Sequence, residues 1–263
     1  MTIECSSLAA ALLSLAVAVP AMATPVELLS HRAAYRLTLA SPSGAAGVTA
    51  VQGGLVMEWR AECDGWISSQ RLGFVAATDG GPGFSYDVRF SSWESRDNTK
   101  LRFNVRSFDG LEMREEFRGE AALAGSGADG LARYDAPEGT KLDLPAGTIF
   151  PTEHVRRLIE AARSGERVVT HAVFDGSGED ALANVNAVIG PSRERTTATG
   201  TEARWPVNLA YYGTKVSDTL PDFQISFEMD DRGVLYDVML DYGDFALKAD
   251  LEKLEPMPAP DCR

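Results

Sequence analysis

The chain has 263 residues, of which 44% are hydrophobic, and its formal net charge at pH 7 is −13. An acidic protein is repelled by phosphate backbones and by anionic membrane surfaces, so nucleic acid is excluded as an expected partner. A chain of this length can bury a sizeable core within one large domain.

The first 23 residues have the pattern of a secretory signal peptide. Residues 8–19 form an uncharged apolar run, and Ala21-Met22-Ala23 follows it as a cleavage signature. The run is too short to span a bilayer stably, and no later stretch is apolar enough to do so. Residues 1–7 are atypical because they contain Glu4 and no basic residue. We predict cleavage after Ala23 and a single domain over 24–263 that does not span the membrane, with charge −12 once Glu4 is lost.

Apolar and polar residues alternate with period two through the N-terminal half, which predicts β-strands. The expected strands cover 35–39, 51–63, 66–78, 84–91, 101–106 and 112–120. Asp64-Gly65 and Asp109-Gly110 mark turns between neighbouring strands. Residues 121–130 are small and glycine-rich, so we expect a flexible loop there.

One segment breaks the alternation and predicts an amphipathic helix over 153–164. Its apolar residues fall at helical spacing: Val155, Leu158, Ile159 and Ala162. Thr152 is a plausible N-cap, and Gly165 is a plausible stop. We expect the face that carries Leu158 and Ile159 to be buried against a sheet.

Strand patterns resume after the helix and end in a three-stranded meander. The expected strands cover 167–174, 184–189, 205–212, 223–229, 234–242 and 245–252. A turn over 230–233 joins the first two strands of the meander, in a hairpin with a four-residue connection. One face of the second strand is expected to carry Val234, Tyr236, Val238, Leu240 and Tyr242.

This succession of strands around one helix excludes a βαβ architecture and predicts a mainly β fold. So long an antiparallel sheet must curl or close to remove its edges. We therefore expect a large curled antiparallel sheet, either a β-spiral or an open barrel-like form. The principal amphipathic helix would cover or fill its opening.

No motif in the chain predicts catalysis, a metal site or a cofactor. The stretch Phe174-Asp175-Gly176-Ser177-Gly178-Glu179-Asp180 could ligate calcium, but its spacing does not match an EF-hand, which favours a tight acidic surface loop. The three histidines, His31, His154 and His171, are scattered and fit no metal template. The chain lacks a G-x-S-x-G elbow and a glycine-rich phosphate loop. We predict a protein that is not an enzyme.

Four tryptophans lie on or beside expected strands: Trp59, Trp66, Trp93 and Trp205. The simpler interpretation makes them ordinary core residues. The alternative is that some of them line an apolar lumen that accepts a lipid or a peptide.

The cysteines predict one disulfide bond. Cys5 would leave with the signal peptide, which leaves Cys63 and Cys262 in an oxidising compartment. A redox-active pair is typically close in sequence, as in Cys-x-x-Cys, so we expect a structural bond.

Seven groups of residues, spread over the whole exported chain, suggest a family. They are Leu29-Ser30-His31-Arg32-Ala33-Ala34-Tyr35; Glu58-Trp59 with Cys63-Asp64-Gly65; Ser92-Trp93-Glu94; Leu144-Pro145-Ala146-Gly147-Thr148 with Phe150-Pro151-Thr152-Glu153-His154; Val173-Phe174-Asp175-Gly176; Leu240-Asp241-Tyr242-Gly243-Asp244-Phe245; and Cys262. In their order and spacing they resemble the envelope-integrity protein B (EipB-like) family of alphaproteobacterial proteins, formerly a domain of unknown function.

The resemblance implies a periplasmic protein that folds as a spiral of antiparallel strands, broadly similar to lipoprotein carrier and receptor folds. It also implies that a disulfide joins an early strand to the C-terminal end, which corresponds here to Cys63 and Cys262. The implied role is maintenance of cell-envelope integrity under stress.

Three hypotheses for function follow. The leading one is a non-enzymatic periplasmic factor that maintains the envelope by binding an envelope protein partner or an apolar, lipid-like ligand. The second is a carrier or chaperone for lipid or lipoprotein. The third is a hydrolase of envelope polymers, which would require a clustered nucleophile and base.

Overall fold

A computed structural model describes residues 24–41, 47–178, 181–197, 200–214 and 219–262. The expected signal peptide lies outside these residues, and so do Glu179 and Asp180 of the acidic loop. The strands of the N-terminal half are β1 His31–Ser41, β2 Val48–Ala61, β3 Gly65–Thr78, β4 Phe84–Ser95, β5 Lys100–Asp109, β6 Glu112–Leu123, β7 Gly130–Ala136, β8 Lys141–Leu144 and β9 Thr148–Ile149. The helix α1 Pro151–Ser164 follows, and then β10 Val168–Phe174, β11 Leu182–Ile189, β12 Arg193–Thr197, β13 Gly200–Tyr212, β14 Phe223–Asp230, β15 Leu235–Asp241 and β16 Ala246–Pro256.

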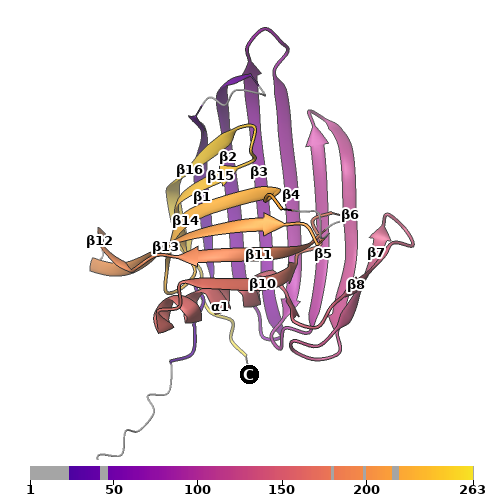
Figure 1. Cartoon of the computed structure of the whole chain (residues 1–263), viewed down its shortest axis with the longest axis vertical. Helices are drawn as coiled ribbons and strands as arrows, with labels where there is room; N and C mark the ends of the chain where they lie inside the picture. The colour runs from indigo at the N-terminus through magenta and orange to yellow at the C-terminus, as the bar shows by residue number, and fades with distance from the viewer. Residues whose placement is uncertain (1–23, 42–46, 179–180, 198–199, 215–218, 263) are drawn as a thin grey trace, which may run out of the picture.

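All the strands belong to one sheet, which confirms the expected curled, mainly β fold. Its order is β8-β7-β6-β5-β4-β3-β2-β1-β16-β15-β14-β13-β11-β10-β9, and β12 pairs with β13 outside this path. The first and last strands, β1 and β16, are therefore neighbours. Figure 1 shows β1 to β6 standing side by side, while β10, β11, β13 and β14 run across them. The sheet has curled until strands from its two halves face each other.

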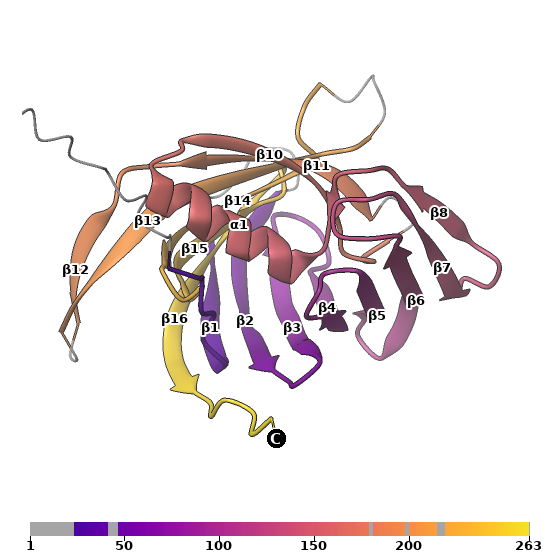
Figure 2. The same cartoon turned by 90° about the horizontal axis from the view of Figure 1, so that it is seen from below.

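One pair of strands departs from the expected antiparallel pattern. The short strand β9 pairs with β10 in parallel, through Thr148 with Ala172 and Ile149 with Val173. Parallel neighbours need a crossover connection, and α1 provides it. Seen from below, α1 lies across the space that the curled sheet surrounds (Figure 2).

The helix largely follows its expected course. It begins at Pro151, whose missing N–H makes it suitable for the first helical position, and it ends at Gly165 in the left-handed conformation. The proposed N-cap is wrong: Phe150 occupies that position without a side-chain cap, and Thr152 lies within the first turn. Leu158 and Ile159 are fully buried, as expected.

Two expectations about the strands are also wrong. Residues 121–130 are not all loop, because β6 continues to Leu123 and Ala121 is buried.

On β15, Tyr236 does not share a face with Val238. A bulge at Asp237, whose φ is +50°, breaks the alternation, so Leu235 faces inward and Tyr236 lies outside under the guanidinium of Arg204.

The core consists of two apolar clusters. The larger, which we call the lumen cluster, is formed by residues of β1–β3, β9, α1, β10, β11 and β13–β16, with Val26 before β1. The smaller, which we call the packed cluster, joins β5–β8 to the chain on either side of α1. Its buried members are Leu101, Phe103, Ala121, Leu123, Ala132, Tyr134, Leu144, Phe150, Phe174, Ala181 and Leu182.

Candidate functional site

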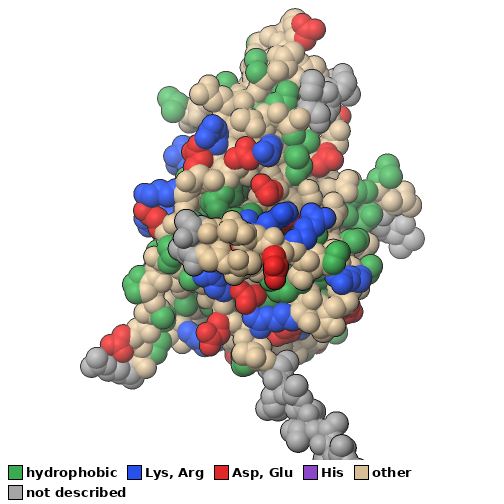
Figure 3. Space-filling model, turned by 90° about the vertical axis from the view of Figure 1, so that its left-hand side faces the viewer, with side chains coloured by type: hydrophobic (Ala, Val, Ile, Leu, Met, Phe, Trp, Pro, Cys, Tyr) green, Lys and Arg blue, Asp and Glu red, His purple; other side chains and the backbone are tan. Residues whose placement is uncertain are grey.

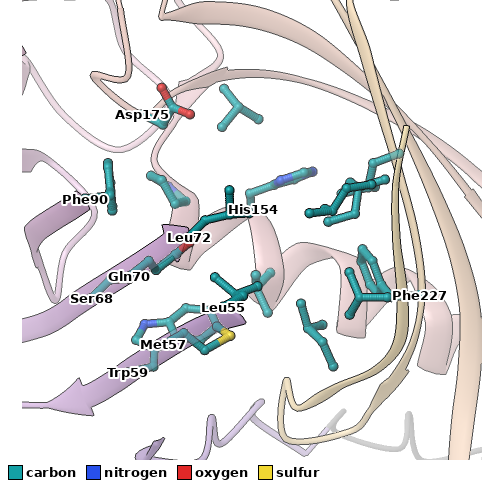
Figure 4. A pocket seen from close by; sticks show the side chains of 18 of the residues that line it. Leu55, Met57, Trp59, Ser68, Gln70, Leu72, Phe90, His154, Asp175 and Phe227 are labelled. Atoms are coloured by element: carbon teal, nitrogen blue, oxygen red, sulfur yellow. Dashed lines mark hydrogen bonds between the residues drawn. The ribbon is translucent and has the colours of Figure 1, made fainter. Parts of the chain in front are cut away.

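The curled sheet encloses a lumen with a volume of about 380 Å³. This volume lies within the roughly 300–1,000 Å³ range of small-molecule sites. Most of the side chains that line it are apolar or aromatic, and the other residues of its wall are Ser68, Gln70, Ser92, Thr152, His154 and Asp175. In the view of Figure 4, Asp175, Gln70 and Ser68 lie toward one side of the pocket and Phe227 lies at the opposite side. These three polar side chains lie among apolar ones, since Phe90 is on the same side.

The register of β2, β3 and β4 builds one wall in layers. Across these strands, one layer holds Trp59, Ser68 and Ser92; the next holds Met57, Gln70 and Phe90; the third holds Leu55, Leu72 and Val88. Since side chains alternate between the two faces of a strand, the residues between them point outward. Val56, for example, is 48% exposed. The polarity of this wall falls from the first layer to the third.

The opposite wall is almost wholly apolar. Leu209 of β13, Ile225 of β14 and Leu240 of β15 are paired across their strands, and all three line the lumen. Tyr35 of β1 also lines it, but its hydroxyl donates a hydrogen bond to the carbonyl oxygen of Leu235 at 2.9 Å. The tail of an apolar ligand would therefore meet hydrocarbon and ring carbon on this side.

A buried carboxylate fixes α1 across the end of the lumen. Glu94 of β4 is 3% exposed, and it accepts hydrogen bonds from the backbone N–H groups of Thr152 at 2.7 Å and Glu153 at 3.1 Å. Glu94 thus caps the N-terminus of α1, which has no capping side chain of its own. A negative charge at this end of the helix also complements the helix dipole. Burial raises the pKa of Glu94 to about 7, although the two N–H donors oppose the shift.

Two histidines meet at the lumen. His154 of α1 and His171 of β10 lie with ring centroids 5.4 Å apart, edge to face. His154 is 5% exposed and lines the lumen, and its Nε2 atom has no hydrogen-bond partner. Burial, followed by the proximity of His171 and Arg157, lowers the pKa of His154 to about 3, so this imidazole is neutral at pH 7.

Asp175 is held at the end of β10 by a tight turn. Its Oδ1 accepts a hydrogen bond from the backbone N–H of Ser177 at 2.8 Å. Gly176 has a φ of +75°, and a Cβ there would lie 2.3 Å from the ring of Phe103, so only glycine fits. Burial raises the pKa of Asp175, with Ser177 opposing the shift. The expected acidic surface loop is wrong at this residue, because Asp175 is half-buried and lines the lumen.

The charges of the sheet gather on its outer face. Arg71 and Asp87 pair at 2.7 Å, and Arg106 and Glu116 pair at 2.9 Å, on side chains that point away from the lumen. One face of the molecule shows basic and acidic side chains interspersed (Figure 3). Among the described residues that line the lumen there is no lysine or arginine.

The tryptophans divide between the two interpretations. Only Trp59 lines the lumen; it packs edge-on against Trp66, with centroids 6.1 Å apart, and its indole N–H has no hydrogen-bond partner. Trp205 is a buried core residue, while Trp93 is half-buried beside the guanidinium of Arg102. The lumen interpretation thus holds for one of the four.

The two remaining cysteines are joined. The Sγ atoms of Cys63 and Cys262 lie 2.11 Å apart, in a disulfide between residues 199 apart in sequence. The bond ties the turn between β2 and β3 to the tail after β16. Arg96 steadies the same turn, because its Nε–H donates to the carbonyl oxygen of Cys63 at 3.0 Å.

Two broader features bear on the possible chemistry of the site. Within the described ranges, no three or more histidine, cysteine or acidic side chains cluster closely enough to hold a metal ion. No helix in this part of the chain is long and apolar enough to cross a membrane. Glu94, His154 and Asp175 lie on separate elements and share no local motif, so no pattern in the sequence predicts that the fold brings them to the lumen and its closing helix.

Comparisons with known proteins agree with this architecture. The chain matches the EipB-like family over residues 22–258. It is 31% identical over 245 residues to the cell envelope integrity protein EipB of Brucella abortus, and the alignment covers 89% of this chain and 86% of the relative. The crystal structure of a β-barrel-like protein from a domain of unknown function, also of Brucella abortus, matches with a TM-score of 0.82 and 29% identity, over 89% of this chain and 100% of that one. The family match spans nearly the whole sheet, and this chain therefore belongs to the EipB-like family.

Proposed function

We propose that this protein is a non-enzymatic periplasmic protein that maintains cell-envelope integrity by holding an apolar ligand in its lumen. The observation that carries the proposal is the lumen itself, about 380 Å³ in volume and lined mostly by apolar side chains. The name of its Brucella relative, a cell envelope integrity protein, supports the envelope role. The export pattern of residues 1–23 supports the periplasmic location.

An apolar ligand would complete a surface that folding leaves uncovered. Leu55, Leu72 and Ile225 line the lumen but are only partly buried by their neighbours. Removing such side chains from water contributes about 25 cal/mol per Å² of apolar surface. A ligand with a slender hydrocarbon portion would bury several of them together.

The hydrolase hypothesis finds no support at this site. A nucleophile activated by histidine needs a hydrogen bond to the imidazole. In the described part of the chain, Nε2 of His154 and Nδ1 of His171 have no such partner. The carrier hypothesis also requires a lumen that binds an apolar ligand. It differs from our proposal only because the ligand would then be released to an acceptor.

Binding of the apolar fluorescent probe N-phenylnaphthylamine to protein 24–263 tests the proposal. Leu55→Trp places bulk in the lumen, whereas Val56→Trp adds the same side chain to the outer face at the next position of β2. We expect wild-type protein and Val56→Trp to enhance the probe's fluorescence equally, and Leu55→Trp to lose the enhancement. Equal binding by all three proteins, with melting temperatures unchanged, would place the probe outside the lumen.

The envelope role is tested in the organism that carries the gene. A deletion strain should become sensitive to detergent, and Val56→Trp should restore resistance while Leu55→Trp should not. If both variants restore resistance equally, the lumen is dispensable, and binding to a protein partner through the outer surface explains the role better. Native mass spectrometry of protein recovered from the envelope should show a bound small molecule.

A further inference from the structure

The ionisable groups of the lumen suggest which ligands it accepts. Asp175 is the one carboxylate among the described lining residues, and no lysine or arginine faces it there. His154, which also lines the lumen, is neutral at pH 7 because burial lowers its pKa to about 3. Any negative charge in the lumen therefore comes from Asp175 and is not balanced by a side chain of the protein.

Asp175 is also prepared to accept a further hydrogen bond. Its Oδ1 is engaged by the N–H of Ser177 at 2.8 Å, and among the described residues no lysine or arginine forms an ion pair with the carboxylate. The tight turn at Gly176, packed against Phe103, fixes the backbone that carries Asp175 at the lumen wall. Burial raises the pKa of Asp175, and a cationic group of a ligand beside it would favour the ionised form.

The other unpaired polar atoms of the lumen wall lie inside the wall. His154 is nine-tenths or more buried and lines the lumen, yet its Nε2 lacks a partner. Trp59, equally buried in the wall, has an unpaired indole N–H. Both atoms are buried within the wall and are not accessible from the lumen, which leaves Asp175 as the charged group that a ligand would meet there.

We infer that the lumen binds single-chain amphiphiles with a cationic ammonium head, for which Asp175 is the counter-ion. The inference rests on the proposed function, because it assigns a head group to the apolar ligand of that lumen. The ammonium would lie between Asp175 and the polar layers of β3 and β4, and the hydrocarbon would extend toward Phe227. An anionic head in the same place would face an unscreened carboxylate and no cation.

Competition with N-phenylnaphthylamine by three probes of equal chain length tests the inference: dodecylamine, dodecanol and laurate. In wild-type protein at pH 7 we expect dodecylamine to bind about tenfold more tightly than dodecanol, because a charged pair replaces a neutral hydrogen bond. Laurate should bind more weakly than dodecanol. In Asp175→Asn the preference for the amine over dodecanol should disappear.

Asp244→Asn is the matched control, because it removes the same charge from an exposed turn. It should keep the wild-type order of affinities. If dodecanol binds but the amine binds no better, or if the preference survives in Asp175→Asn, the inference is overturned and the proposed function stands. If none of the three probes competes, the proposed function falls with it. A melting curve of Asp175→Asn establishes that its turn still forms.

Discussion

The two apolar clusters of this sheet differ in how completely their side chains fill the interior. In the packed cluster, the rings of Phe103, Tyr134, Phe174 and Phe150 contact one another edge-on, with centroids 5.1 to 6.5 Å apart. The lumen cluster instead surrounds a cavity of about 380 Å³ and leaves Leu55 and Leu72 only partly buried. One cluster is filled by the chain itself, and the other is left open in its middle.

The difference indicates how a long sheet can enclose space without collapsing into it. The packed cluster fastens β5–β8 to the residues before and after α1, so the curl is fixed at a solid contact away from the lumen. Around the lumen, other devices substitute for core packing. These are the Cys63–Cys262 bond, the Glu94 cap of α1 and the pairing of β1 with β16. The following experiments test this division.

Removal of the disulfide should have the largest effect. The bond closes a loop of 199 residues on the side of the lumen cluster, and a loop of that size corresponds to about 5 kcal/mol in the chain-entropy model. The double variant Cys63→Ser with Cys262→Ser should lose up to that amount in urea unfolding. Reductant should lower the wild-type midpoint and leave the double variant unchanged. If reductant leaves the wild-type unfolding midpoint unchanged, the bond does not stabilise the fold.

Truncation in the packed cluster should cost more than truncation beside the lumen. Phe174 is fully buried, so Phe174→Ala should lower the free energy of unfolding by about 3–5 kcal/mol. Leu55 already borders a cavity, and Leu55→Ala should cost only about 1 kcal/mol. Both values come from denaturant titrations of the same protein. Equal costs would show that the lumen wall is as tightly packed as the ring cluster.

The helix α1, which closes the lumen, has one buried face and one exposed face. Truncations on the two faces should therefore differ in their cost to stability. Leu158 is 1% exposed, and Leu158→Ala should cost about 2–5 kcal/mol. Glu160→Ala, on the exposed face of the same helix, should change stability by no more than about 0.5 kcal/mol. A loss below about 0.5 kcal/mol for Leu158→Ala would mean that α1 is held by its ends alone.

The sequence predicted the fold better than the site. Alternation located most strands, since a strand between lumen and solvent must place its apolar residues on one side. It failed at Asp237, where a bulge shifts the pattern, and at β7, β8, β9 and β12, which are short or lack clear alternation. The region around Glu94 and Thr152 could not be predicted, because their hydrogen bond joins residues 58 apart and depends on how far the sheet curls.

The smallest net effect we expect is a pH dependence, because Glu94 and His154 change the stability in opposite directions. Glu94 has a pKa of about 7 in the folded protein, above its reference value of 4.5, so the folded state binds this proton more tightly than the unfolded state. Its contribution to stability is therefore complete below about pH 4.5 and is lost as the pH rises to about 7, by about 3 kcal/mol. His154 has the opposite sign. Its folded pKa of about 3 lies below 6.5, so its contribution is lost as the pH falls through that interval.

Because the two slopes oppose each other between about pH 4.5 and 6.5, the wild-type profile alone cannot reveal either of them. Glu94→Gln keeps one acceptor for the N–H groups of α1 and removes the titration, so its stability should rise with pH across this interval, as His154 loses its proton in the unfolded state. The stability of the wild type minus that of the variant should then fall with rising pH. Glu160→Gln, an exposed carboxylate on the same helix, should leave the profile unchanged. Parallel profiles for wild type and Glu94→Gln would show that Glu94 stays ionised throughout, with the two backbone donors of α1 outweighing its burial.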